Sequence, residues 1–522
     1  MVGEKSIKDP VHGYIMIPKE YCRLFVDTPI FQRLRLIEQT SMRWLFPGAR
    51  HDRFIHSLGV FHLASRIYDS IKTNVQDEEI RALIGDTNLK GTFLVASLMH
   101  DCGHSPFSHT FEKFYNRNAD GSHHDSAFNA LKKVAPKKDS SDLDFTRIGA
   151  KQPAHHEAMS AYVLLSKYST SVSDIGADPG MAARMITGAS YAQPVSLKDK
   201  VANVFIELVN GSALDVDKLD YIIRDTWASG VKNTAIDVDR LIRGATIVRV
   251  AKQDGNDEVH FAFRKSAISV VQSVIDARNY LYDWIYGHHT VLYYSHLLEQ
   301  AVIRFSKKYA SVNHASPVAV LKHMFSPEMF NERVPLAKRG AIDSYLLSDG
   351  DVLHCLKMIV PGDPDYVAYS SHKPRHIPLW KTGAEYRRCI DRVHQFAISA
   401  ESCISQIRAR FKLTANDCFA CSDLTMKIYD LKDDAVMVEM ASGEVMPITA
   451  VAHLPKHPHL TSGRTASLFY VFLSEDKQAL KSKIIDFINK MPVKNTEYCK
   501  CRYALKGQIC KAKNDKPCHE CR

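Results

Sequence analysis

Most of this chain repeats apolar residues at the three- and four-residue spacing of an amphipathic α-helix. The clearest examples are LGVFHLASRIYDSI from Leu58, GTFLVASLMHD from Gly91, EAMSAYVLLSKY from Glu157 and a long run from Ala267 to Tyr309. Strand-like segments are few. They predict a hairpin around the Asp-Gly pair of TIVRVAKQDGNDEVHFAFR, a second around the Ser-Gly pair of AVMVEMASGEVMPITAV, and a strand in LFYVFLS. The pattern therefore predicts a mainly α fold, with a helical body, small β-hairpins and an α+β C-terminal region.

The change of pattern also predicts the domain organisation. We expect a helical domain over residues 1–410, an α+β region over 411–492 and a separate tail over 493–522. Two polar stretches in the helical part, about 116–152 and 174–196, are expected to be loops or insertions.

Composition and charge narrow the class of protein. With 45% hydrophobic and 24% charged residues in 522, the chain has the composition of a folded globular protein. The first residues lack an apolar run after the basic ones, and apolar stretches stay short of about 18 residues, so we expect neither secretion nor a membrane span. The expected location is the cytoplasm, or the nucleus in a eukaryote, where the 12 cysteines stay mostly reduced. The net charge of +10 suits an anionic partner such as a nucleotide or nucleic acid.

Residues 100–109, HDCGHSPFSH, place three histidines and an aspartate in ten positions. We expect the preceding apolar run to be a buried helix that ends near Cys102–Gly103. Ser105–Pro106 has the residue types that begin a second helix, which would carry His109 and Glu112. The break between the helices would bring the side chains at both ends of this stretch together. Imidazole nitrogens and a carboxylate suit a borderline divalent cation, with further ligands from elsewhere in the chain.

Two other segments can supply those ligands. His56 lies 44 residues before His100, at an amphipathic helix, and LDVDKLDYIIRD places four aspartates in one acidic segment, namely Asp215, Asp217, Asp220 and Asp225. The order His, His-Asp, Asp resembles that of the HD phosphohydrolase superfamily.

The resemblance extends over seven ordered motifs, which are DPVHGYI, DTPIFQRLRLIEQ, FPGARHDRFIHSLGV, HDCGHSPFSH, HHEAMS, DVDKLDYIIRD and ARNYLYDWIYGH. Over residues 4 to about 305 the chain is similar to the deoxynucleoside triphosphate triphosphohydrolases. This branch includes bacterial dGTPase-like enzymes and the mammalian dNTPase that has a sterile-alpha-motif and an HD domain. The resemblance implies release of intact triphosphate and a deoxynucleoside from a dNTP, in nucleotide-pool balance or antiviral defence.

The resemblance also assigns roles to residues around this centre. It implies that a divalent cation (Fe, Mn, Mg or Zn) is bound by His56, His100, Asp101 and Asp217. It implies a catalytic set in which a histidine donates a proton to the leaving oxygen and two partners support it, namely His109, Glu112 and His156. The alternatives are helix-end histidines satisfied by the backbone for the first set and structural hydrogen-bond partners for the second.

Substrate contacts are implied in the same way. The positions that hold the phosphates match Arg53, His104, Lys218 and Arg278, with Tyr221 on the same wall. Gln39 and Asp225 match the pair that binds the sugar 3′-hydroxyl. Tyr286 matches the aromatic residue under the sugar, and Tyr282 stands one turn earlier, where the branch usually has histidine. Two tyrosines four residues apart on a helix are equally typical of a packed core.

In activated members of the branch a guanine nucleotide, GTP or dGTP, bridges subunits of a tetramer. The residues that match this surface are Lys5, Asp27, Gln32 and Arg35. A homo-oligomer, dimer or tetramer, follows from the resemblance. The alternative is an ion-pair network at an ordinary subunit interface.

The tail is not part of the resemblance. It carries eight Lys or Arg against three Asp or Glu over residues 494–522, and six candidate zinc ligands, namely Cys499, Cys501, Cys510, Cys518, His519 and Cys521. We expect a small structural zinc site there, and its +5 charge also suits a nucleic acid. The alternative is a flexible, reduced, basic tail. A separate pair, Cys418 and Cys421, is either a metal half-site or two unrelated core thiols.

Two other functions compete with dNTP hydrolysis. The same centre could serve a nuclease or another phosphodiesterase. A chain with a vestigial centre could instead sense nucleotides or bind nucleic acid through its tail.

Overall fold

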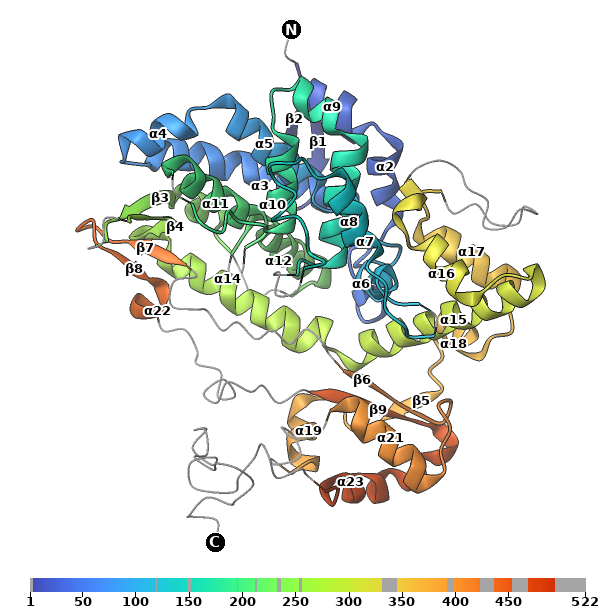
Figure 1. Cartoon of the computed structure of the whole chain (residues 1–522). Coiled ribbons are helices and arrows are strands. Elements are labelled where there is room, and N and C mark those ends of the chain that lie inside the picture. The colour runs from blue at the N-terminus through green and yellow to red at the C-terminus, as the bar shows by residue number, and fades with distance from the viewer. Residues whose placement is uncertain are drawn as a thin grey trace. The chain divides into compact units, whose positions relative to one another are not determined.

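The computed structural model (Figure 1) describes residues 3–118, 120–147, 152–194, 196–211, 214–231, 236–252, 256–330, 345–391, 399–422, 436–452 and 468–492. The chain forms two compact units, each discontinuous in sequence. Unit 1 comprises Met1–Leu281, Glu299–Pro361 and Leu431–His453, and unit 2 comprises Tyr282–Leu298, Gly362–Asp430 and Leu454–Arg522. Among the described residues, no helix is long and apolar enough to cross a membrane.

Unit 1 is mainly helical, as the sequence predicts. Its helices are α1 (Lys19–Tyr21), α2 (Pro29–Gln32), α3 (Arg53–Asn74), α4 (Glu78–Ile84), α5 (Thr87–Met99), α6 (His109–Glu112), α7 (Ser126–Val134), α8 (His155–Lys167), α9 (Ser169–Asp174), α10 (Pro179–Thr187), α11 (Leu197–Val209), α12 (Val216–Ser229), α13 (Val238–Arg243), α14 (Ile268–Leu281), α16 (Pro317–Met324), α17 (Asp349–Ile359), α22 (Ile448–Val451) and the later part of α15 (His289–Asn313).

The core of unit 1 forms around α5. Every residue from Gly91 to Met99 is buried, because the helix is apolar on all sides and neighbouring helices cover it. α3 and α10 pack against α5, and α12 packs against α3. Asp52 fixes the start of α3 by accepting a hydrogen bond from the Ile55 amide at 2.9 Å. These contacts decide which helix ends meet.

Two small sheets belong to unit 1 (Figure 1). Their strands are β1 (Glu4–Asp9) and β2 (Gly13–Pro18) in one, and β3 (Ala245–Val250), β4 (Glu258–Arg264), β7 (Met437–Glu439) and β8 (Val445–Pro447) in the other. The β3–β4 and β7–β8 pairs are the two predicted hairpins, and both are antiparallel. β7 also pairs in parallel with β4, with Ala262 opposite Met437.

Unit 2 contains a three-stranded antiparallel sheet of order β5-β9-β6. Its elements are β5 (His376–Pro378), β6 (Cys418–Ser422), β9 (Phe469–Ser474), α18 (Pro364–Ser371), α19 (Gly383–Cys389), α21 (Ala400–Phe411), α23 (Lys481–Asn489) and the first part of α15. β9 is the predicted strand of LFYVFLS, and it is buried on both faces because it is central. Cys418 and Cys421 stand three positions apart on β6 and so face opposite sides of the sheet, which favours two separate thiols over a half-site.

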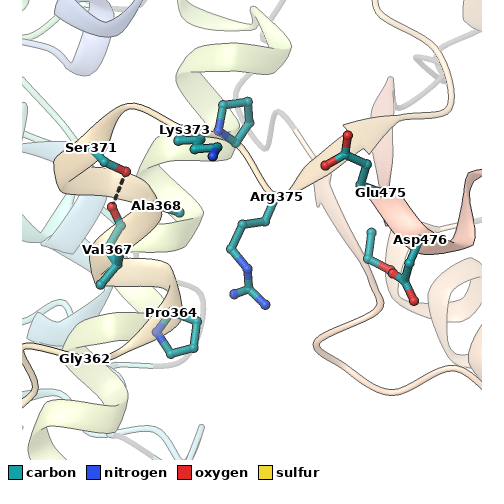
Figure 2. A pocket seen from close by; sticks show the side chains of 11 residues that line it. Gly362, Pro364, Val367, Ala368, Ser371, Lys373, Arg375, Glu475 and Asp476 are labelled. Atoms are coloured by element: carbon teal, nitrogen blue, oxygen red, sulfur yellow. Dashed lines mark hydrogen bonds between the residues drawn. The ribbon is translucent and has the colours of Figure 1, made fainter.

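An open pocket of about 800 Å³ lies on unit 2 between α18 and the turn after β9 (Figure 2). Lys373 and Arg375 line it together with Glu475 and Asp476, and the Arg375 side chain extends into it. It contains none of the residues predicted to form the site.

Several local expectations were wrong. The polar stretches 116–152 and 174–196 contain α7 and α10, respectively. The helix expected from Ser105–Pro106 begins only at His109, after a series of turns. The two units do not follow the expected boundary near residue 410, and that domain boundary stays a prediction.

Candidate metal centre and active site

Four predicted metal ligands lie together where three helices of unit 1 meet. His56 is on α3, His100 and Asp101 follow the last turn of α5, and Asp217 is in the first turn of α12. The Nε2 atoms of His56 and His100 are 3.3 Å apart. Asp217 Oδ1 lies 3.0 Å from the first and 3.6 Å from the second. Asp101 approaches both nitrogens, with Oδ2 3.6 Å from His56 Nε2 and Oδ1 3.6 Å from His100 Nε2.

The hydrogen bonds made by Nδ1 of His56 and His100 leave Nε2 of each ring available to a cation. His100 Nδ1 lies 2.9 Å from the Ser97 carbonyl oxygen, which can only accept, so this nitrogen carries the ring proton. His56 Nδ1 lies 2.7 Å from Asp220 Oδ2. A neutral imidazole with its proton on Nδ1 has a lone pair on Nε2, and both Nε2 atoms face the carboxylates. The ligand atoms of His56, His100 and Asp217 therefore lie close enough together to hold a divalent cation. Asp101 lies beside them, and its role as a fourth ligand stays a prediction.

The electrostatics of the centre favour positive charge among its carboxylates. Burial alone would lower the pKa of His56, but its hydrogen bonds with Asp217 and Asp220 raise that pKa to about 9. Burial would likewise raise the pKa of Asp217, yet His100 and His56 hold it well below its usual range. The histidines and carboxylates thus stabilise each other's charged forms.

Asp220 links the centre to a buried network that the sequence did not reveal. Besides His56, it contacts His12 Nε2 at 2.6 Å and the Arg224 guanidinium at 2.8 and 3.0 Å. Arg224 also donates to both oxygens of Asp9, at 3.0 and 3.2 Å. The i, i+4 spacing of Asp220 and Arg224 was a visible signal. The contacts with residues 9 and 12 were not, because they join positions more than 200 residues apart.

A second cluster lies beside the metal centre and contains the predicted catalytic residues. Glu112 accepts hydrogen bonds from Nδ1 of His109 and Nδ1 of His156, both at 2.8 Å. α8 brings His156 here because it passes close to Gly103, where an added Cβ would lie 2.3 Å from the backbone nitrogen of Ser160. Burial would raise the pKa of Glu112, but the two histidines hold it well below its usual range. Although burial opposes it, Glu112 raises the pKa of His156 to about 9.

His104 and Arg53 lie between the two clusters. His104 is fully buried and stacks on His156 with ring centroids 4.2 Å apart, and neither of its ring nitrogens has a hydrogen-bond partner in the structure. Burial lowers its pKa well below the usual value, so it is neutral. Arg53 donates to Asp101 at 2.7 Å and lies 3.4 Å from His109 Nε2. Its side chain is only 4% exposed, so it joins the clusters from within the protein.

Most other predicted substrate residues of unit 1 lie on α12 and around it. Lys218 Nζ contacts Asp215 at 2.5 Å and the Gly211 carbonyl at 2.9 Å. Tyr221 accepts a hydrogen bond from Arg278 Nε at 3.3 Å. These roles in binding phosphates stay predictions.

The predicted sugar-binding pair has an additional neighbour. Asp225 Oδ1 lies 2.6 Å from His51 Nε2, and the backbone N–H of Gln39 donates to the His51 carbonyl at 3.2 Å. The side-chain oxygen of Gln39 is buried without a hydrogen-bond partner in the structure. His51 precedes His56 in the same motif, and its role was missed because one residue in a motif does not show what its side chain faces.

Tyr282 and Tyr286 belong to unit 2, where their rings contact each other edge to face at 5.1 Å. The six tail residues, Cys499, Cys501, Cys510, Cys518, His519 and Cys521, lie outside the described residues.

The residues predicted to bind a guanine nucleotide form two exposed pairs. Lys5 Nζ lies 3.4 Å from Asp27, and Arg35 Nε donates to Gln32 at 2.9 Å. Gln32 in turn donates to the Val26 carbonyl at 2.8 Å, one residue before Asp27. Binding of a guanine nucleotide by these residues stays a prediction.

Comparison with known proteins agrees with this geometry. Residues 53–203 match the HD domain family. SAMHD1, a deoxynucleoside triphosphate triphosphohydrolase of Gallus gallus, is 30% identical over 293 residues, covering 54% of this chain and 42% of that protein. The SAMHD1 homologue of Dictyostelium discoideum is 29% identical over 297 residues, covering 55% and 46%. The uncharacterised YwfO of Bacillus subtilis is 26% identical over 291 residues, covering 55% and 52%. The chain spans about half the length of the curated relatives it matches.

Solved structures show the fold over more of the chain. A hypothetical protein from Aquifex aeolicus has a TM-score of 0.58 at 18% identity, covering 92% of this chain and 100% of that one. A phosphohydrolase from Bacteroides thetaiotaomicron has a TM-score of 0.59 at 20% identity, covering 90% and 100%.

Proposed function

We propose that this chain, whose residues 53–203 match the HD domain family, hydrolyses dNTPs to a deoxynucleoside and inorganic triphosphate. The observation that carries the proposal is the position of the His109–Glu112–His156 cluster, which Arg53 links to the four predicted metal ligands. The likeness to triphosphohydrolases such as the SAMHD1 proteins supports the choice of substrate.

In the proposed reaction the predicted metal ligands hold a cation and the His109–Glu112–His156 cluster supplies a proton. When bound by His56, His100, Asp101 and Asp217, a divalent cation would neutralise phosphate charge and lower the pKa of water. His104 is fully buried at the boundary of the clusters, and its ring stacks on that of His156, so it supports the catalytic cluster from behind. Its neutral state spares it the cost of a buried, uncompensated charge.

His109 is the proposed proton donor. Its side chain is 61% exposed, so a bound substrate can reach it, and Glu112 fixes the ring through Nδ1. Its Nε2, which Arg53 approaches to 3.4 Å, can then deliver a proton to the 5′ oxygen as the bond to phosphorus breaks. The buried ionised Glu112 stabilises the protonated ring before transfer, and the charged His156 keeps Glu112 ionised.

The decisive experiment incubates the purified chain with each of the four dNTPs and Mn²⁺ and separates the products by chromatography. Release of triphosphate supports the proposal. Release of pyrophosphate or of single phosphates would refute it, and hydrolysis of cyclic or polymeric phosphodiesters alone would favour the rival phosphodiesterase reaction. His109→Ala should lower kcat by about 100- to 10,000-fold while the metal content, measured by plasma mass spectrometry, stays unchanged.

We propose further that a guanine nucleotide at Lys5, Asp27, Gln32 and Arg35 promotes homo-oligomer assembly. The two exposed pairs offer both charges and amide groups to such a ligand. Light scattering with and without GTP tests this, and Lys5→Ala should abolish any GTP-dependent increase in mass. An unchanged increase would refute it.

A further inference from the structure

The loop between Asp101 and His109 is held in an unusual backbone conformation. Phe107 and Ser108 have φ values of 54° and 49°, in the left-handed region that residues with side chains rarely adopt. They are adjacent and nearly fully buried. Such strain persists only where surrounding contacts impose it. Ser108 directly precedes α6, so its conformation sets the direction in which His109 leaves the loop.

Two residues that are distant in sequence hold the loop from one side. Asp349, the first residue of α17, accepts from the Phe107 amide at 2.6 Å and from the Glu38 amide at 2.9 Å. Arg33 donates through Nη2 to the His104 carbonyl at 2.8 Å and through Nε to the Leu347 carbonyl at 2.6 Å. The start of α17 is thus tied to both ends of the strained loop.

The other face of the loop is held from within the site. Arg53 Nε donates to Ser108 Oγ at 2.9 Å, and that hydroxyl donates to the Glu38 carbonyl. Glu38 therefore contacts the loop through its carbonyl and Asp349 through its amide. The strained segment is closed on both sides by hydrogen bonds between buried groups.

We propose that Asp349 and Arg33 are positioning residues of the active site, which hold the His104–Ser108 loop so that His104 packs on His156 and His109 faces the substrate. This rests on the proposed phosphohydrolase function. Neither residue touches the reacting atoms. They act by imposing the left-handed conformations at Phe107 and Ser108, without which the loop would relax and turn His109 away from the metal centre.

Asp349→Asn tests the proposal with little change in shape. An asparagine has one oxygen, so either the Phe107 amide or the Glu38 amide faces an NH₂ group and loses its acceptor. Because a misplacement of about 1 Å can cost about 100-fold in rate, we expect kcat to fall by about 10- to 100-fold. KM and bound metal should stay at the wild-type level. Arg33→Lys should act in the same direction, since one ammonium group cannot replace the fork that reaches both carbonyls.

The matched control is Asp351→Asn. Asp351 belongs to the same helix start and caps it by accepting from Ser348 N at 2.8 Å, whereas the hydrogen bond to the Phe107 amide is made by Asp349. This variant weakens the start of α17 and should leave kcat unchanged. Equal losses of kcat in Asp351→Asn and Asp349→Asn would overturn the proposal, because the effect would then be general destabilisation.

Amide hydrogen exchange separates this proposal from the proposed reaction. In Asp349→Asn, peptides covering residues 104–108 should exchange faster than in the wild type and in Asp351→Asn. Unchanged exchange refutes the positioning role even if the enzyme hydrolyses dNTPs. Faster exchange in a chain that hydrolyses no dNTP would instead leave the loop contacts established and refute the proposed function.

Discussion

The carboxylate of Asp220 should control both the metal affinity and the stability of unit 1. It is fully buried and contacts the His56 ring at 2.7 Å, the His12 ring at 2.6 Å and the Arg224 guanidinium at 2.8 Å. Asp220→Asn keeps the shape but leaves one oxygen acceptor for these groups. Its amide NH₂ then faces a donor, and the buried Arg224 loses one of two anionic partners.

The magnitudes follow from these contacts. Removing one partner of a buried ion pair lowers the free energy of unfolding by about 3–5 kcal/mol. We expect a loss at the lower end of this range, because Arg224 keeps its second partner, Asp9. Losing the carboxylate that orients a metal-binding histidine lowers metal affinity by about 10- to 100-fold. The affinity is measured by titrating Mn²⁺ against a competing chelator, and the stability by the apparent unfolding temperature, because two units need not unfold in one step.

Asp139→Asn is the control for stability alone. Asp139 forms a buried pair with Arg184 at 2.5 Å, and Arg184 also keeps a second partner, Asp142, at 2.6 Å. Both variants should lower the unfolding temperature, and only Asp220→Asn should weaken Mn²⁺ binding. If Asp220→Asn bound Mn²⁺ as tightly as the wild type, the idea that this carboxylate orients His56 for a cation would be wrong.

Three further predictions test other contacts. Gly59→Ala should lower the free energy of unfolding by about 1–3 kcal/mol or more, and with it the unfolding temperature, because the added Cβ would lie 1.9 Å from Asp220 Oδ1. Gly48→Ala is the control and should be neutral, because its Cβ would meet no atom within 4 Å. Equal effects of the two glycine variants in thermal unfolding would contradict this close packing. Burial raises the pKa of Glu38 to about 8 from an ordinary 4.5. Between these two pH values the folded chain holds a proton on Glu38 that the unfolded chain has lost. The free energy of unfolding should therefore fall as pH rises from about 4.5 to about 8. In Glu38→Gln the unfolding temperature should fall less between pH 4.5 and 8 than in the wild type. An unaltered pH profile would count against the raised pKa of Glu38. Replacing the cysteines of residues 493–522 by serine should remove one equivalent of zinc from the purified chain and leave the metal at the HD centre; an unchanged zinc content would exclude a tail site.

The sequence predicted those parts of the molecule that depend on local patterns. The apolar period located α3, α5 and α8, and the Asp-Gly and Ser-Gly turns located both hairpins. α7 and α10 were missed because short helices in polar surroundings have weak periodicity. The parallel pairing of β4 with β7 joins segments more than 170 residues apart, so no local pattern could indicate it.

The candidate site divides in the same way. The motif order indicated which residues converge, since His56, His100 and Asp217 each stand in a recognisable segment. The supporting contacts were not predictable. Ser105–Pro106 has the residue types of a helix start, yet the hydrogen bond from Phe107 to Asp349 overrides this local preference and delays the helix to His109.

The pairing of β4 with β7 affects how the gene can be shortened for expression. A chain cut near residue 410, where the amino-acid pattern changes, would lose both β7 and β8. Ala262 to Arg264 would then present unsatisfied backbone groups along an open strand edge, a template for self-association. A minimal soluble fragment should therefore retain residues 436–452, fused back through a linker or supplied in trans.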